Sequence, residues 1–73
     1  MPRFFVNIRC ANRLIRDYQG DVFIDLLAVI EDTIQAGREM AAQGLFAEPC
    51  SIEITDRWGA LLATVPFKNF ATH

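Results

Sequence analysis

The chain has 73 residues, a formal net charge of −2, and an apolar fraction of 52% that includes six phenylalanines. This length predicts one domain, residues 1–73, near the lower limit for folding without stabilising cross-links. The apolar content excludes a largely disordered chain, because disordered segments are poor in aromatic and branched residues. The small net charge excludes a protein that binds polyanions with its whole surface.

Three features bear on the compartment. The apolar segment 4–6 is interrupted at Asn7 and is too short for a secretory signal, and the apolar run 26–30 is far shorter than the roughly 20 residues of a membrane span. Two cysteines, Cys10 and Cys50, are too few for a disulfide-rich secreted scaffold. We therefore expect a cytoplasmic protein with free thiols, although the sequence leaves open whether the two cysteines are bridged.

The first part of the chain reads as a β-hairpin. Residues 3–10 alternate with a period of two, which predicts a strand with Phe4, Val6, Ile8 and Cys10 on one face. A tight turn at 11–12 returns the chain as a second strand, about residues 13–17, whose buried face the sequence leaves open. A β-turn at 17–20 then ends the hairpin.

A one-sided helix is predicted for residues 26–43. Asp25 is a good N-cap, and its charge suits the positive end of the helix dipole. Apolar side chains fill one half of the helical wheel and polar side chains fill the other, which is typical of a helix lying on a sheet. Gly37 lies near the centre of the apolar half, where a missing side chain lets a strand approach closely.

Two more strands follow the helix, at about residues 51–56 and 60–67, and residues 69–73 read as a tail. Alternating Ile52 and Ile54 give the first of these strands one apolar face. The order ββαββ predicts an α+β domain: a four-stranded antiparallel sheet, order 2-1-3-4, with one helix packed on one face. Aligning the alternations of the two central strands places Cys10 opposite Cys50.

The last strand has apolar residues on both faces. If the turn at 56–59 carries a glycine bulge, Leu61, Val65 and Phe67 face away from the helix, beside Phe5; without the bulge, Leu62 does. Pro66 cannot donate to a ladder, so this strand is an edge or ends there.

Short motifs along nearly the whole chain resemble a family of short bacterial proteins described only as a domain of unknown function. The motifs are turns, caps and core positions, at residues 1–5, 14–17 with Gly20, 25–26, 54–56 with Gly59, and 65–67. The resemblance implies a single compact domain and offers no activity to carry over.

Catalysis finds no support in the residues. His73 is the only histidine and stands last, so neither a Ser-His-Asp nor a Cys-His arrangement can be assembled on a rigid element. Two distant cysteines make no zinc site, and isolated glycines make no phosphate loop. We expect no enzyme, no catalytic, cofactor-binding or metal-binding residues, no cofactor, no membrane partner and no small-molecule substrate.

The sheet face away from the helix is the predicted partner surface. Its candidate interface residues are Phe5, Leu61, Val65 and Phe67, an apolar set larger than a wet sheet face normally carries. We expect a homodimer or another protein partner there. The alternative is a nucleic-acid-binding or regulatory module that uses the arginines of the first hairpin, which lie in an acid-free segment: Arg3, Arg9, Arg13 and Arg16.

Overall fold

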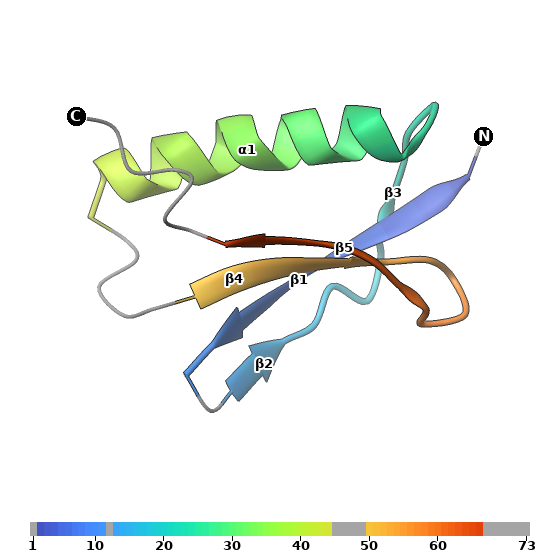
Figure 1. Ribbon diagram of the computed structural model, residues 1–73, viewed down its shortest axis with the longest axis horizontal. Helices are drawn as coiled ribbons and strands as arrows, with labels where there is room; N and C mark the ends of the chain where they lie inside the picture. Colours follow the sequence, from blue (N-terminus) through green and yellow to red (C-terminus); the bar gives the residue numbers. More distant parts are fainter. Residues whose placement is uncertain (1, 12, 45–49, 67–73) are drawn as a thin grey trace.

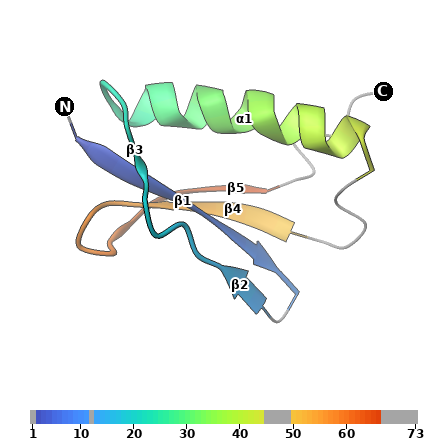
Figure 2. The ribbon, with the colours of Figure 1, turned by 180° about the vertical axis from the view of Figure 1, so that it is seen from behind.

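The computed structural model describes residues 2–11, 13–44 and 50–66, which form two layers (Figure 1). One helix lies along one face of an antiparallel sheet, and the view from behind shows the same arrangement (Figure 2). The described elements are β1 Arg3–Cys10, β2 Arg13–Ile15, β3 Asp21–Val22, α1 Leu26–Ala42, β4 Cys50–Thr55 and β5 Leu61–Pro66. The α+β class with one helix on one face is therefore as predicted.

Within the described residues the sheet has five strands, where the sequence predicted four. Its order is β2-β1-β4-β5, and the additional strand β3 pairs with β1. The register between the central strands β1 and β4 is the predicted one, with Val6 opposite Ile54 and Cys10 opposite Cys50. This register is set by the two apolar alternations, because a slip of one residue would turn every apolar side chain to the wrong face.

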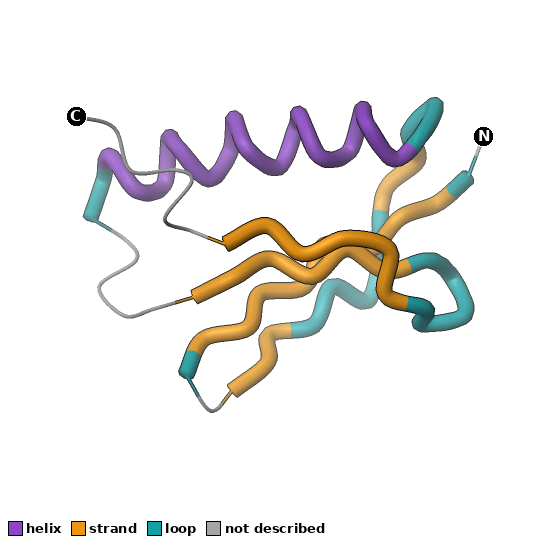
Figure 3. Tube along the Cα trace, viewed as in Figure 1, coloured by secondary structure: helices purple, strands orange, loops and turns teal. Residues whose placement is uncertain are grey.

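The edge of β1 is covered by one interrupted strand. Ile8 pairs with Ile15 in β2, and Phe4 pairs with Asp21 in β3, so the three residues 5–7 of β1 lie opposite the five residues 16–20 of the partner segment. The two extra residues bulge out in the loop between β2 and β3, which Figure 3 shows in teal. The predicted second strand therefore ends at Ile15 and not at residue 17.

The helix begins and ends as its sequence indicates. The Asp25 carboxylate accepts the backbone N–H of Ala28 at 2.9 Å, and the chain leaves the helix through Gln43 and Gly44, whose φ is +72°. Val29 of α1 is fully buried and forms the core with four strand residues: Phe4, Ile52, Ile54 and Val65. Gly37 is also buried, on the side of α1 that faces the sheet.

Both predictions for the last strand were partly wrong. Gly59 has φ +84° and closes the turn as predicted, and Leu61 lies opposite Thr55 on the face away from α1. A bulge at Leu62 then shifts the register by one residue, which turns the following side chains over. Val65 therefore lies opposite Ile52 in the core, only 6% exposed, and Phe67 is outside the described residues.

The expectation of free thiols was also wrong. A disulfide joins Cys10 and Cys50, whose Cα atoms are 4.1 Å apart. The two residues are direct partners in the β1–β4 ladder, and such a short Cα separation belongs to the narrow pairs of an antiparallel ladder.

No helix in the described ranges is long and apolar enough to span a membrane.

Candidate functional site

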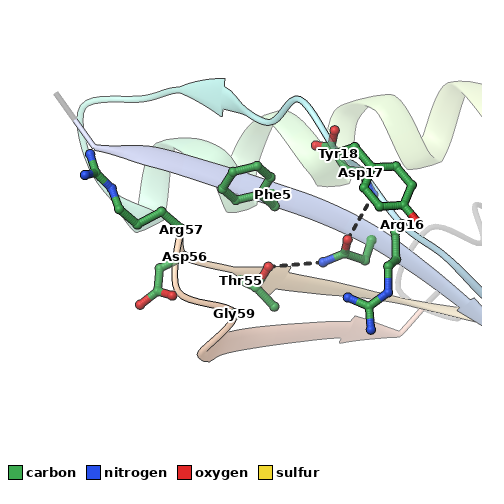
Figure 4. Close-up of a pocket in the computed structure, with 9 residues that line it drawn as sticks. Phe5, Arg16, Asp17, Tyr18, Thr55, Asp56, Arg57 and Gly59 are labelled. Carbon is green, nitrogen blue, oxygen red and sulfur yellow. Dashed lines mark hydrogen bonds between the residues drawn. The ribbon is translucent and has the colours of Figure 1, made fainter.

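The sheet face away from α1, called the outer face below, carries a hollow between two loops. The β2–β3 loop forms one wall and the β4–β5 turn forms the other (Figure 4). The hollow has a volume of about 190 Å³, and we call it the two-loop hollow. Its lining residues are Phe5, Asn7, Arg16, Asp17, Tyr18, Thr55, Asp56, Arg57 and Gly59.

Asn7 is the polar centre of the floor and is 7% exposed. Its side-chain amide donates to the Glu53 carbonyl at 3.0 Å and to the Thr55 hydroxyl at 3.2 Å. Its Oδ1 accepts the backbone N–H of Asp17 at 3.0 Å. Since a buried amide is costly unless its groups are bonded, Asn7 ties β1, β4 and the β2–β3 loop into one rigid base.

Asp17 anchors the first wall with both carboxylate oxygens. Oδ2 accepts the backbone N–H of Val6 at 3.1 Å, and Oδ1 accepts those of Gln19 and Gly20 at 3.2 and 2.9 Å. Partial burial alone raises the pKa of Asp17, but these three backbone donors and the charge of Arg3 lower it below its ordinary value of 3.8. The carboxylate is thus ionised at neutral pH and acts as a structural acceptor.

Phe5 forms the apolar part of the floor and is held from one side by Gly20. A Cβ on Gly20 would lie 2.8 Å from the Phe5 ring and 2.7 Å from the Phe4 carbonyl oxygen. Gly20 also has φ +67°, a conformation that side-chain-bearing residues rarely adopt. Glycine at this position therefore lets the loop pass directly against the ring.

In the second wall, as in the first, an aspartate carboxylate holds the loop by accepting backbone N–H groups. The Asp56 Oδ1 accepts the backbone N–H groups of Trp58 and Ala60, both at 2.9 Å. This turn projects Arg57 and Trp58 outward, with the guanidinium 5.2 Å from the centre of the indole ring. Trp58 remains 82% exposed, so the stacked pair presents a large surface to solvent.

The rim of the hollow combines aromatic and cationic groups. Arg16 and Arg57 lie toward opposite ends of the hollow, with Phe5 between them (Figure 4). Tyr18 is 85% exposed beside Arg16. Neither arginine forms an ion pair with another described residue, so both remain available for an incoming group.

The structure divides the predicted interface residues. Phe5 is half-buried in the hollow, and Leu61 is 58% exposed on the same face. Val65 faces the core instead, for the register reason given above, and Phe67 cannot be placed. The outer face is accordingly less apolar than the sequence predicted.

The predicted nucleic-acid contacts are likewise not brought together. Arg3 donates to the Gln19 carbonyl at 2.9 Å, and Arg9 pairs with the Glu53 carboxylate at 2.6 Å. Arg13 lies opposite Cys10 and thus on the helix side of the sheet. Of the four arginines, Arg16 is the one that lines the hollow.

Sequence reasoning missed Tyr18, Arg57 and Trp58. A signal for them exists: residues 16–18 and 56–58 each contain one arginine, one aspartate and one large aromatic residue. In both loops the aspartate binds backbone N–H groups, while the aromatic side chain remains exposed. The two similar loops meet across β1 and β4, and together they form the walls of the two-loop hollow.

A model of the family described as a domain of unknown function, DUF6894, matches residues 3–68. The chain belongs to the DUF6894 family. No curated protein and no solved structure matches the chain. The match extends over both loops of the DUF6894 domain, so the walls of the hollow lie within the family region. Within the described part of this DUF6894 chain, no group of three or more His, Cys, Asp or Glu side chains could hold a metal ion.

Proposed function

We propose that this DUF6894 protein is a non-enzymatic binding module that recognises a protein partner through the two-loop hollow of its outer face. The observation that carries the proposal is the exposure of Tyr18 and Trp58, at 85% and 82%, on the two loops that wall the hollow. Tyr, Trp and Arg are the residue types most enriched at the energetic centres of protein interfaces.

The charges of the hollow indicate which partner group it fits. Arg16 and Arg57 line it from opposite ends (Figure 4), and backbone N–H groups bind both oxygens of the Asp17 carboxylate and one oxygen of the Asp56 carboxylate. A guanidinium forms a bidentate pair with a carboxylate, so an acidic side chain of the partner fits between the arginines. The aromatic groups then cover that pair and exclude water from it.

Binding is favoured over catalysis because Asp17, the carboxylate at the floor of the hollow, is a poor proton-transfer group. Three backbone donors occupy Asp17, and its lowered pKa keeps it ionised near neutral pH. A general acid or base needs a pKa near the working pH and a free lone pair or proton. Asp17 lacks the first property, and its three backbone donors occupy most of its acceptor sites.

Capture from an extract of the native host tests the partner. Bait proteins would be wild type, Arg16→Ala/Arg57→Ala and Trp58→Ala, with Arg38→Ala as the matched control because Arg38 is exposed on α1. We expect one protein to be retained by wild type and by the control but lost with both hollow variants. Identical capture by all four baits would overturn the proposal.

A second copy of the chain is the simplest partner. Light scattering across a tenfold dilution detects self-association as a mass that falls on dilution, and Trp58→Ala should abolish it if the hollow is the contact. A constant monomer mass combined with hollow-dependent capture would instead identify a different protein.

Single-stranded nucleic acid is the second candidate, favoured by exposed Tyr18 and Trp58 as stacking groups beside arginines. Asp17, Glu53 and Asp56 on the same face argue against it, because they oppose a phosphate backbone. Fluorescence anisotropy with a labelled oligonucleotide at low salt separates the two. Micromolar binding that Trp58→Ala weakens would favour nucleic acid over a protein partner.

A further inference from the structure

A second cavity lies on the other side of the sheet, between α1 and the central strands. Its volume is about 230 Å³. Apolar side chains from both layers line most of it: Val6, Ile8, Phe23, Met40 and Ile52. This cavity, called the interlayer cavity below, is separate from the two-loop hollow, and no residue lines both.

The cavity exists because α1 presents small residues to the sheet at this point. Thr33, Ala36 and Gly37 line it, and Thr33 and Gly37 are buried. Ala36 is exposed, so it lines the cavity where the cavity meets solvent. For comparison, a cavity of about 150 Å³ lined by Leu, Ile and Phe stays dry and binds benzene. The interlayer cavity is large enough for one ring with a short chain.

Two carboxylates complete the lining. Asp21 comes from β3 and Asp32 from α1, and both residues are exposed. Neither forms an ion pair with a described residue, and the Oδ1 of Asp21 accepts only the adjacent backbone N–H of Val22, at 2.8 Å. The cavity therefore has an apolar interior and a negatively charged boundary.

We propose that the interlayer cavity binds a small apolar cation, an arylamine or alkylamine whose ring or chain enters between α1 and the sheet. Its ammonium group then meets the carboxylates of Asp21 and Asp32 near solvent, where charge-assisted hydrogen bonds form. Burial of the apolar part supplies affinity, and the two carboxylates supply selectivity for a cation. This site is independent of the proposed partner surface.

The direct test is a titration followed by amide NMR with three probes of similar size. These are 2-phenylethylamine, the neutral 2-phenylethanol and the anionic 3-phenylpropanoate. We expect the amine to shift the amides of Ile8, Thr33 and Ile52, the alcohol to bind about fivefold to tenfold more weakly, and the anion more weakly still, because exposed charge pairs contribute factors of this size. Equal affinities, shifts confined to the two-loop hollow, or no saturable shift at millimolar amine would each overturn the proposal.

Substitutions test separately the role of the two carboxylates and the role of the cavity volume. Asp21→Asn and Asp32→Asn should each weaken amine binding about threefold and together about tenfold, whereas Glu31→Gln, which lies next to Asp32 outside the lining, should change it less than twofold. Ala36→Leu should weaken all three probes by narrowing the mouth of the cavity, and leucine keeps the helix because its propensity is close to that of alanine. An equal loss with Glu31→Gln, or unchanged binding to the Ala36→Leu protein with an intact amide spectrum, would contradict the site.

Discussion

The Asp17 carboxylate accepts the backbone N–H of Val6 at 3.1 Å, at the position where the β1–β2 ladder would otherwise continue. A side chain here replaces a backbone carbonyl as the partner of β1. Because this side chain takes the place of a backbone partner, the chain can leave the sheet, pass over Phe5 at Gly20 and rejoin β1 as β3. The wall that carries Arg16 and Tyr18 thus depends on one carboxylate.

Asp17→Asn should lower the free energy of unfolding by about 1–3 kcal/mol, since its amide nitrogen would replace an acceptor and leave a partly buried donor unpaired. Asp56→Asn is the matched control, because only Oδ1 of Asp56 accepts hydrogen bonds among the described residues and asparagine retains that oxygen. Urea unfolding measures both variants. Equal effects of the two substitutions would show that the second oxygen of Asp17 is not needed.

The lowered pKa of Asp17 predicts a pH dependence. A carboxyl whose pKa is lower in the folded state stabilises that state above its unfolded pKa, and the contribution is lost as the pH falls through the folded value. The stability difference between wild type and Asp17→Asn should therefore shrink as the pH is lowered from 6 toward about 3. A constant difference over this range would mean that Asp17 titrates normally in the folded protein.

Alanine substitutions at Gly20 and Gly44 distinguish the free-energy cost of a positive φ from the cost of a steric clash. Both have positive φ, +67° and +72°, but a Cβ on Gly44 meets no described atom within 4 Å. Gly44→Ala should cost about 1–2 kcal/mol from the backbone alone. Gly20→Ala should cost a further 1–3 kcal/mol or so, because its Cβ collides with the Phe4 carbonyl and the Phe5 ring. Equal melting temperatures for the two variants would exclude the close contact at Phe5.

The elements that could be predicted from the sequence are those with a long pattern. Residues 3–10 and the helix carry enough periodic positions to fix their type, and the two alternations of β1 and β4 fix the register. β3 escaped prediction because two residues, Asp21 and Val22, show no period. It is specified by tertiary contacts with β1 and by the loop that Asp17 holds.

The candidate site was harder to predict than the fold. The bulge at Leu62 has no glycine or proline to mark it, yet it decides that Val65 joins the core while Leu61 stays on the outer face. Tyr18 and Trp58 lie in turns, where no period reveals the direction of a side chain. Their shared neighbours, one arginine and one aspartate in each loop, were the available signal.

The disulfide should contribute substantially to stability. Cys10 and Cys50 are separated by 40 residues, and closing a loop of that length restricts the unfolded chain by roughly 4 kcal/mol in the chain-entropy account. For a domain of this size, that is a large share of the total free energy of unfolding. We expect Cys10→Ala/Cys50→Ala to unfold at a clearly lower urea concentration than the oxidised wild type.

Reduction provides the control for that double variant. Wild type treated with a thiol reductant should fall to nearly the same urea midpoint, while the double variant should not respond to the reductant. Alkylation without prior reduction, followed by intact mass measurement, should leave the oxidised wild type unmodified even when unfolded, because a disulfide offers no thiolate. Two added alkyl groups in that sample, together with a reductant-insensitive midpoint, would show that β1 and β4 are held by their ladder alone.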